Sequence, residues 1–334
     1  MNSPKVIIVG SGIAGLSLAL KLDAKHPGIS ILIITKAEAM ESNTRYAQGG
    51  IAAVLNTNTD SIQSHIDDTI ASGGELCNRE IVEMVVNNAA DEIAWLRKMG
   101  VVFDQNENGE LNMALEGGHH HPRVVHAKDQ TGLSVAETLL KRVLESSNIE
   151  IKTNLLVADL IKENNSIVGL HIYNESENKY ESLYSNFIIL STGGCGQLFE
   201  NTTNPSVATG DGYAMAIRAG ALLQNMQYIQ FHPTALYQKK ISQSAFLISE
   251  AVRGFGAHVV DNKGVRFLFA EDIRGELATR DIVSDAINKY KTKHHLNCVY
   301  LDIRHIDYTK FRNHFPTITD KLEEQGFDIR KDLI

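Results

Sequence analysis

Residues 6–15 read Val-Ile-Ile-Val-Gly-Ser-Gly-Ile-Ala-Gly and predict a strand, a glycine turn and the start of a helix. The β-branched run is typical of a buried parallel strand. In the turn, Gly10 allows a tight bend, Gly12 lets the backbone approach a pyrophosphate, and Gly15 lets helix and strand pack closely. The amide groups at the helix start would then face two phosphates. The stretch therefore predicts a nucleotide site.

The composition is that of an ordinary globular protein. Hydrophobic residues make up 43% of the 334 residues, charged residues 22%, and the net charge is -8. Negative charge argues against nucleic acid as a partner. Three scattered cysteines fit a reducing compartment. Because we find no signal-peptide pattern and no apolar run that could span a bilayer, we expect a soluble cytoplasmic protein.

The second predicted strand, residues 29–34, bears on which dinucleotide binds. In NAD-binding folds an acidic residue ends this strand and binds the adenosine ribose. Here Thr35 and Lys36 follow instead, which disfavours NAD and leaves NADP open. Lys36 is then either a contact to a phosphate or the ribose, or a solvated loop charge.

Two further segments suggest a larger cofactor. Residues 186–194 read Asn-Phe-Ile-Ile-Leu-Ser-Thr-Gly-Gly and predict a second buried strand that ends in glycines. Gly193 and Gly194 would allow the backbone to approach the same cofactor closely. Residues 42–50 are small and polar, and they either wrap a flat ring system or form an ordinary loop.

Several motifs together resemble the L-aspartate oxidase family, within the superfamily of succinate dehydrogenase and fumarate reductase flavoproteins. The resemblance runs in one register from about residue 5 to about residue 330. The motifs that carry it are Ser42-Asn43-Thr44, Tyr46 to Ala53, Glu116-Gly117-Gly118-His119, His126-Ala127, Asp129, Thr131-Gly132, Ser191 to Gly194, Thr202 to Pro205, Gly210-Asp211-Gly212, Gln230 to Tyr237, Glu250, Arg253-Gly254 and Arg280 to Val283.

The resemblance implies an α/β fold, in which a Rossmann-like FAD-binding domain carries an inserted α+β capping domain. We expect residues 1–225 to form an incomplete FAD-binding domain and residues 226–334 the capping domain. Family members continue with a second return to the FAD-binding domain and a C-terminal helical domain, which we do not expect within this sequence. The resemblance thus describes a C-terminally truncated chain.

The resemblance also implies FAD rather than NADP. Succinate-oxidising relatives usually carry a histidine, covalently joined to the flavin, where this chain has Asn43, so we expect non-covalent FAD. The expected cofactor-binding residues are Gly10, Ser11, Gly12, Ile13, Ala14, Gly15, Lys36, Asn43, Thr44, Arg45, Tyr46, Ala47, Gln48, Gly49, Gly50, Thr192, Gly193, Gly194 and Asp211.

The implied reaction moves a hydride from Cα of L-aspartate to the flavin and leaves iminoaspartate. Arg280 matches the arginine to which the family assigns proton transfer. Because the pKa of arginine exceeds about 12, we expect it to bind a carboxylate and to move protons only within a network. The alternative is a helix-terminal charge paired with Asp281. Gln230, Ser249 and Glu250 are expected to bind the substrate.

Glu116 and His232 complete the expected catalytic set with Arg280. Relatives acting on succinate usually have an apolar residue before the Gly-Gly pair, whereas Glu116 offers the α-ammonium of aspartate a charged partner. The alternative is a surface glutamate that caps a loop. His232 would donate a hydrogen bond to a substrate carboxylate.

The histidine run 119–121 suggests a metal cluster at first sight. Adjacent side chains diverge, however, and no acid or cysteine joins them at ligand spacing, so we expect no metal. We expect His119 to lie close to Glu116. Asp129 and Thr131-Gly132 predict a capping turn before a helix around residues 133–143.

Three functions stay open from the sequence. We favour a truncated L-aspartate oxidase that takes the first step of NAD biosynthesis through quinolinate. The alternatives are a succinate- or fumarate-type flavoprotein and an inactive flavin-binding fragment. The resemblance names O2 or fumarate as the electron acceptor and quinolinate synthase as the enzyme that uses the product.

Overall fold

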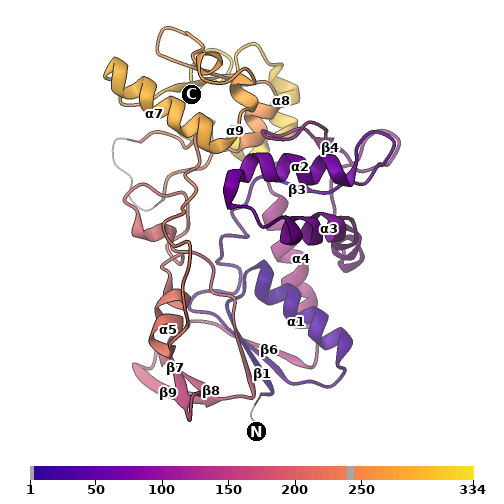
Figure 1. The fold of residues 1–334 in the computed structure, drawn as a ribbon, viewed down its shortest axis with the longest axis vertical. Coiled ribbons are helices and arrows are strands. Elements are labelled where there is room, and N and C mark those ends of the chain that lie inside the picture. Colours follow the sequence, from indigo (N-terminus) through magenta and orange to yellow (C-terminus); the bar gives the residue numbers. More distant parts are fainter. Residues whose placement is uncertain (1–3, 239–243) are drawn as a thin grey trace. The chain divides into compact units, whose positions relative to one another are not determined.

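The computed structural model describes residues 4–238 and 244–334, which form two compact units (Figure 1). Unit 1 contains residues 4–47, 132–228 and 244–245. Unit 2 contains residues 48–131, 229–238 and 246–334. No helix within the described residues is both long and apolar enough to cross a membrane.

A four-stranded parallel sheet forms the centre of unit 1. Its order is β10-β1-β2-β6, with β1 at Val6–Val9, β2 at Ile31–Ile34, β6 at Ile149–Lys152 and β10 at Phe187–Leu190. The side chains of β1 and β2 are all buried, as their β-branched runs predict. The prediction that β10 is also a buried strand is wrong: β10 lies at the sheet edge, and Phe187 is exposed.

Both faces of the parallel sheet are covered. On one face, α1 (Ile13–Lys25) packs through Gly15 onto Ile8 of β1. On the other face, Ile7 and Ile34 join a core with an antiparallel sheet and a helix. Those elements are β7 (Leu155–Glu163), β8 (Ser166–Asn174), β9 (Lys179–Tyr184) and α5 (Asp211–Ala219). A 3-10 helix, η2 (Gly196–Leu198), belongs to the same unit.

Unit 2 begins with a small antiparallel sheet and two paired helices. The strands, in the order β3-β5-β4, are β3 (Ile51–Ala52), β4 (Met113–Ala114) and β5 (Val124–Val125). The helices are α2 (Ile62–Gly73) and α3 (Arg79–Met99), with η1 (Gly74–Leu76) between them. Arg123 is fully buried at the end of the loop between β4 and β5. It forms ion pairs with Asp60 at 2.8 Å and Asp68 at 2.6 Å, which fix this loop to α2 and to the residues just before it.

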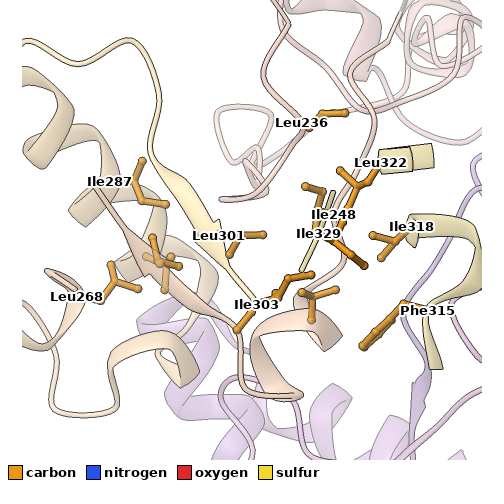
Figure 2. Close-up of a cluster of buried hydrophobic side chains, with 14 of the residues drawn as sticks. Leu236, Ile248, Leu268, Ile287, Leu301, Ile303, Phe315, Ile318, Leu322 and Ile329 are labelled. Carbon is orange, nitrogen blue, oxygen red and sulfur yellow. The ribbon is translucent and has the colours of Figure 1, made fainter. Parts of the chain in front are cut away.

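The rest of unit 2 surrounds a continuous apolar core (Figure 2). Ile248, Leu301 and Ile318 are among its buried members. The elements are α6 (Glu250–Gly254), β11 (His258–Val260), η3 (Leu268–Ala270), η4 (Gly275–Leu277), α7 (Arg280–His294), β12 (Tyr300–Asp302), α8 (Tyr308–His314) and α9 (Pro316–Glu324). Strands β11 and β12 pair antiparallel.

The helix predicted around residues 133–143 is confirmed as α4, Thr131–Glu145, but its expected cap is wrong. Asp129 Oδ2 accepts the backbone N–H of Ile318 at 2.8 Å, so Asp129 caps the first turn of α9 instead. Thr131 Oγ1 accepts the N–H of Ala127 at 3.0 Å and closes the turn before α4. A long-range partner therefore replaces the local one.

The compact units differ from the linear division expected at residue 225. The chain does leave unit 1 near Tyr228, but residues 48–131 belong to unit 2 as well. The reason is that the strands and helices of residues 48–131 pair with each other and with the later part of unit 2, as Asp129 does. The assignment of residues 226–334 as a capping domain stays a prediction.

We expect Gly15→Ala to destabilise the chain by about 1–3 kcal/mol, because overpacking a tight contact forces backbone shifts. A Cβ at Gly15 would lie 2.0 Å from the carbonyl oxygen of Gly10. Urea unfolding followed by circular dichroism measures the change. Gly49→Ala is the matched control, because a Cβ there meets nothing within 4 Å. Equal midpoints for the two variants would contradict this account of the helix–strand contact.

Candidate functional site

A cavity of about 600 Å³ opens in unit 1 where β1, β2 and β10 end. The carboxyl edge of a parallel sheet is where α/β proteins bind their ligands. The cavity is lined by twelve of the predicted cofactor residues, namely Gly10, Ser11, Gly12, Ile13, Ala14, Lys36, Asn43, Thr44, Thr192, Gly193, Gly194 and Asp211.

The three glycines of the first turn differ in what they do. Gly10 has a φ of +112°, and a Cβ there would lie 2.2 Å from the carbonyl oxygen of Ser191. Gly15 is required by the contact between α1 and Gly10. At Gly12, by contrast, a Cβ would meet Thr44 Oγ1 only at 3.5 Å. Packing within the chain explains Gly10 and Gly15 but does not demand a glycine at position 12, which fits the expected approach of a ligand.

Ser11 gives this cavity an unsatisfied polar group. The residue is 4% exposed, and its hydroxyl has no hydrogen-bond partner among the described residues. It precedes the first turn of α1, whose amides have no partners within the helix. The amide of Ile13 donates to Thr44 Oγ1 at 3.0 Å. A buried hydroxyl beside a helix N-terminus fits an anionic ligand such as a pyrophosphate.

Lys36 is paired across the cavity wall. Its ammonium group forms an ion pair with Asp211 and donates to Thr209 Oγ1 at 2.5 Å. Burial raises the pKa of Asp211, but hydrogen bonds from Lys36 and Thr209 outweigh burial and lower it overall. Because the charge of Asp211 offsets that of Lys36, the extra phosphate of NADP would be attracted less strongly to this position. This pairing weighs against the NADP alternative.

The other predicted cofactor residues do not line the cavity within the described part of the chain. Gly15 serves packing, whereas Arg45, Tyr46 and Ala47 lie on an exposed stretch of unit 1. Gln48, Gly49 and Gly50 belong to unit 2. Leu155–Val157 and Val207–Ala208 also line the cavity, and sequence reasoning missed them. Their apolar side chains carry no motif that would have marked them.

A second group of candidate site residues lies in unit 2 and is centred on Glu250. This carboxylate is only 5% exposed and lies between two guanidinium groups. Its Oε2 accepts from Arg280 Nε at 2.5 Å, and its Oε1 lies 3.0 Å from Arg253 Nη2. The Arg253 contact is an ion pair without hydrogen-bond geometry, so Arg253 Nε and Nη2 lack hydrogen-bond partners within the described residues.

Arg280 is the first residue of α7 and faces the cluster. Besides Glu250, it donates from Nη1 to Gln230 Oε1 at 3.0 Å. Arg280 forms its ion pair with Glu250, rather than with Asp281. Two of the three nitrogens of its guanidinium group are thus held by protein groups. The bonds fix the plane of the guanidinium group, which a carboxylate ligand could meet at Nη2.

Glu116 lies close to this cluster. Burial raises the pKa of Glu116, and the neighbouring charge of Glu250 raises it further, while Arg280 and the amide of Gly50 oppose the rise. The following glycine permits the approach, since a Cβ at Gly117 would lie 2.2 Å from Glu250 Oε1. The structure therefore brings Glu116, Glu250 and Arg280 together as expected.

His232 is held uncharged beside the same arginines. Burial lowers its pKa to about 3, and the positive charges of Arg280 and Arg253 contribute to the shift. Its Nδ1 lies 3.2 Å from the amide nitrogen of Thr234 and 3.0 Å from the carbonyl oxygen of that residue. In the tautomer whose Nδ1 accepts from the amide, Nε2 carries the proton and can donate to a ligand.

Ser249 is buried and caps α6. Its hydroxyl oxygen accepts the N–H of Ala251 at 3.3 Å, which leaves the hydroxyl proton able to donate. The backbone N–H of Ser249 donates to Gln48 Oε1 at 3.0 Å, and Gln48 Nε2 donates to the carbonyl of Leu247 at 2.9 Å. Gln48 thus bonds to the backbone of unit 2.

The histidine run contacts two different charged groups. His119 Nδ1 lies 3.2 Å from Arg123 Nη1, and its amide bonds to the carbonyl of Glu116, as its expected place near Glu116 requires. His120 pairs with Asp68. Within residues 4–238 and 244–334, no group of three or more histidine, cysteine, aspartate or glutamate side chains is arranged to hold a metal ion.

Sequence reasoning gave no role to Arg253. Its spacing of three residues from Glu250 on one helix is a signal for a contact between the two side chains. That contact is present, and it places a buried cation beside the ion pair of Arg280.

Comparison with known proteins adds to this geometry. The chain is 43% identical over 337 residues to an L-aspartate oxidase of Acinetobacter baylyi, covering 98% of this chain and 61% of the relative. It is 41% identical to an L-aspartate oxidase of Yersinia pestis, covering 98% of this chain and 63% of the relative. The chain thus spans somewhat less than two thirds of the length of these curated relatives.

A solved structure agrees with the observed fold. It is a quinol fumarate reductase of E. coli that carries a single mutation in its FrdA chain. The similarity has a TM-score of 0.92 at 30% sequence identity and covers 99% of this chain and 59% of that one. The expected α/β fold of the flavoprotein type is thereby confirmed.

Residues 5–333 match the family described as FAD binding domain. The cavity in unit 1, with its glycine turn, helix N-terminus and unsatisfied Ser11 hydroxyl, fits the pyrophosphate of that cofactor. The chain therefore belongs to the FAD binding domain family and has FAD as its cofactor.

Proposed function

We propose that this protein oxidises L-aspartate to iminoaspartate with non-covalently bound FAD. The observation that carries the proposal is the position of Glu116 beside the Glu250–Arg280 ion pair, since the next residue, Gly117, packs directly against the carboxylate of Glu250. L-aspartate brings one ammonium and two carboxylates, so its site needs both an anion and cations. Unit 2 supplies an anion at Glu116 and cations at Arg280 and Arg253.

In the proposed holoprotein, the cavity of unit 1 holds the cofactor. Ser11 and the first turn of α1 donate to the pyrophosphate, and the Lys36–Asp211 pair lies toward the adenosine end. Asn43 lines the same cavity, and its amide offers no nucleophile for a covalent bond to the flavin. When bound, FAD accepts the hydride that leaves Cα of the substrate.

The residues of unit 2 orient the substrate and receive its proton. The Cα–H bond breaks with its electron pair, and one N–H bond of the ammonium breaks as the C=N bond of iminoaspartate forms. Glu116 first pairs with the ammonium and then accepts that proton. Because burial raises the pKa of Glu116, its carboxylate is a stronger base than an exposed glutamate.

Arg280 binds a substrate carboxylate through Nη2, while Glu250 and Gln230 hold its other nitrogens. The fixed guanidinium plane orients Cα–H. His232 remains neutral and donates from Nε2 to a carboxylate. Ser249 adds its hydroxyl proton, and the amide nitrogen of Gln230 offers a further donor.

The proposal extends to the pathway and the acceptor. The reaction is the first step of NAD biosynthesis, in the cytoplasm, and its unstable product passes to quinolinate synthase. Either O2 or fumarate takes the electrons. The names of the relatives support the substrate, and the likeness to a fumarate reductase supports fumarate as an acceptor.

One observation favours a second candidate, a fumarate- or succinate-type flavoprotein. The solved structure that matches with a TM-score of 0.92 is a fumarate reductase. Glu116 argues against this alternative, because an anion beside the substrate repels a dicarboxylate that lacks an ammonium group. Asn43 argues against it as well, because it stands where succinate-oxidising relatives usually carry the histidine that is joined to the flavin. The third candidate, a flavin-binding chain without turnover, is separated from both by assaying the purified chain with FAD, L-aspartate and either acceptor.

We expect Ser11→Ala to weaken FAD binding about tenfold, as the loss of one hydrogen bond to a charged phosphate predicts. The same change should leave the cofactor-free chain equally stable, or more so, since it removes a buried hydroxyl without a partner among the described residues. FAD titration by fluorescence and urea unfolding measure the two effects. Ser17→Ala is the control, because the Ser17 hydroxyl bonds to the carbonyl of Ile13. Unchanged FAD affinity in Ser11→Ala would contradict the assignment of Ser11 to the pyrophosphate.

We expect Glu116→Gln to reduce the affinity for L-aspartate at least tenfold and to leave the affinity for succinate equal or higher. The glutamine keeps the shape but removes the charge that pairs with the ammonium. Perturbation of the flavin absorbance during ligand titration gives both dissociation constants. Glu107→Gln, an exposed carboxylate in the same unit, is the matched control. If both affinities fall equally, Glu116 does not select the ammonium.

The raised pKa of Glu116 also predicts a pH dependence. As the pH falls through that pKa, Glu116 becomes neutral and loses its attraction for the ammonium. The ratio of L-aspartate to succinate affinity should therefore fall toward acid, over a window that lies above the ordinary glutamate pKa of 4.5. Titrations at half-unit pH steps measure the ratio, and Glu116→Gln should flatten it. A ratio that stays constant in the wild-type chain would exclude ionised Glu116 as the partner.

A further inference from the structure

We propose that Gln48 is a positioning residue, whose side-chain amide fixes the segment that presents Ser249 and Glu250 to the substrate. The inference rests on the proposed function, since it concerns the same site. The sequence predicts Gln48 at the cofactor, whereas its hydrogen bonds point to a role in the substrate cluster.

The amide of Gln48 makes two bonds to one extended segment. Its Nε2 donates to the carbonyl of Leu247 at 2.9 Å, and its Oε1 accepts the N–H of Ser249 at 3.0 Å. A backbone carbonyl can only accept and a backbone N–H can only donate, so one orientation of the amide satisfies both. Gln48 is 8% exposed, which limits competition from water for these bonds.

The opposite edge of this segment is already paired. Leu236 donates from its N–H to Phe246, and Ile248 donates to the carbonyl of Thr234, which forms an antiparallel bridge. Thr234 also donates from its hydroxyl to the carbonyl of Ile248 at 2.8 Å. Successive residues of an extended strand direct their backbone groups to opposite edges of the strand. Leu247 therefore directs its carbonyl to the other edge, where Gln48 takes the place of a third strand.

The two hydrogen bonds from the Gln48 amide to Leu247 and Ser249 form a clamp. The clamp ends at Ser249, next to the charged cluster. Ser249, whose N–H is held by Gln48, caps α6 by accepting the N–H of Ala251. Glu250 is the next residue and holds the guanidinium of Arg280. A shift of Ser249 would therefore move both the hydroxyl donor and the carboxylate that orients Arg280. Gln48 touches none of the reacting atoms and acts through Ser249 and Glu250.

Two substitutions separate the parts of the clamp. Gln48→Ala removes both bonds. Gln48→Glu keeps the acceptor for Ser249, and its carboxylate faces the carbonyl of Leu247 without a proton at neutral pH. When that glutamate becomes protonated, it regains a donor and both bonds can form. The matched control is Gln197→Glu in unit 1, because Gln197 Nε2 also donates to a backbone carbonyl, that of Asn204, at 2.7 Å.

The first measurement needs neither cofactor nor substrate. In the full 334-residue chain, NMR follows hydrogen exchange at the Ser249 amide and the Nε–H resonance of Arg280. We expect Gln48→Ala to speed exchange at Ser249 at least tenfold and to shift the Arg280 resonance away from its ion-paired position. Gln197→Glu should change neither. If both signals stay at their wild-type values in Gln48→Ala, the clamp does not position Glu250 and the proposal is overturned.

The second measurement tests the link to the substrate in the FAD-loaded chain. We expect the dissociation constant for L-aspartate, relative to wild type at each pH, to rise at least fivefold in Gln48→Glu at pH 8. It should return toward the wild-type value as the pH falls, whereas Gln48→Ala should show no such recovery. A ratio within twofold of wild type at every pH would overturn the role in substrate binding.

The outcomes of the two proposals are distinguishable. A wild-type chain that retains FAD but does not bind L-aspartate would contradict the proposed function. In that case the Ser249 exchange and the Arg280 resonance still decide whether Gln48 positions the segment. Should Gln48→Ala fail to fold, the conservative Gln48→Glu variant carries both measurements.

Discussion

The buried carboxylate of Glu250 sets the arrangement of the candidate substrate site. An ionised carboxylate that loses its water must be paired. Glu250 is paired twice, with Arg280 at 2.5 Å and with Arg253 at 3.0 Å. These arginines come from α7 and from α6 itself, so the charge of Glu250 ties the start of one helix to the body of another. The neutral state of His232 follows as well, because burial and the two guanidinium groups oppose a third positive charge.

Glu116 adjusts the net charge of this cluster to its proposed ligand. Replacing an apolar residue with an ionised glutamate lowers the charge of the cluster by one. L-aspartate differs from succinate by an added ammonium, which makes the ligand less negative by one. The total charge of site and ligand is therefore the same for a glutamate with L-aspartate as for an apolar residue with succinate. An ionised glutamate at this position thus favours the ligand that carries an ammonium group. Gly117 makes the arrangement sterically feasible, since a side chain there would collide with Glu250.

How far the sequence predicts each site depends on the kind of group that forms it. The turn at residues 10–15 was predictable because its constraints are local: Gly10 needs a positive φ, and Gly15 needs room beside Gly10. The same is true of β1 and β2, whose β-branched runs mark buried strands. Asp129 shows the limit of local reasoning. Its expected partner was the nearby helix α4, but it caps α9, 189 residues along the chain.

The charged cluster around Glu250 could not be found from pattern alone, because its members are spread from residue 116 to residue 280 and a spacing rule joins only Glu250 and Arg253. The resemblance to a family named most of these residues, but their partners came only from the structure. Gln48 illustrates the difference between what the family resemblance implies and what the structure shows. Its neighbours in sequence suggested contact with a cofactor. Its side-chain amide instead bonds to Leu247 and Ser249, which lie 199 and 201 positions further along the chain. The backbone groups of those two residues needed hydrogen-bond partners at an otherwise open edge. The need of buried backbone groups for hydrogen bonds is a general constraint. Which side chain meets that need is decided by the tertiary fold, and here the choice places a glutamine next to the residues that bind the substrate in the proposed reaction.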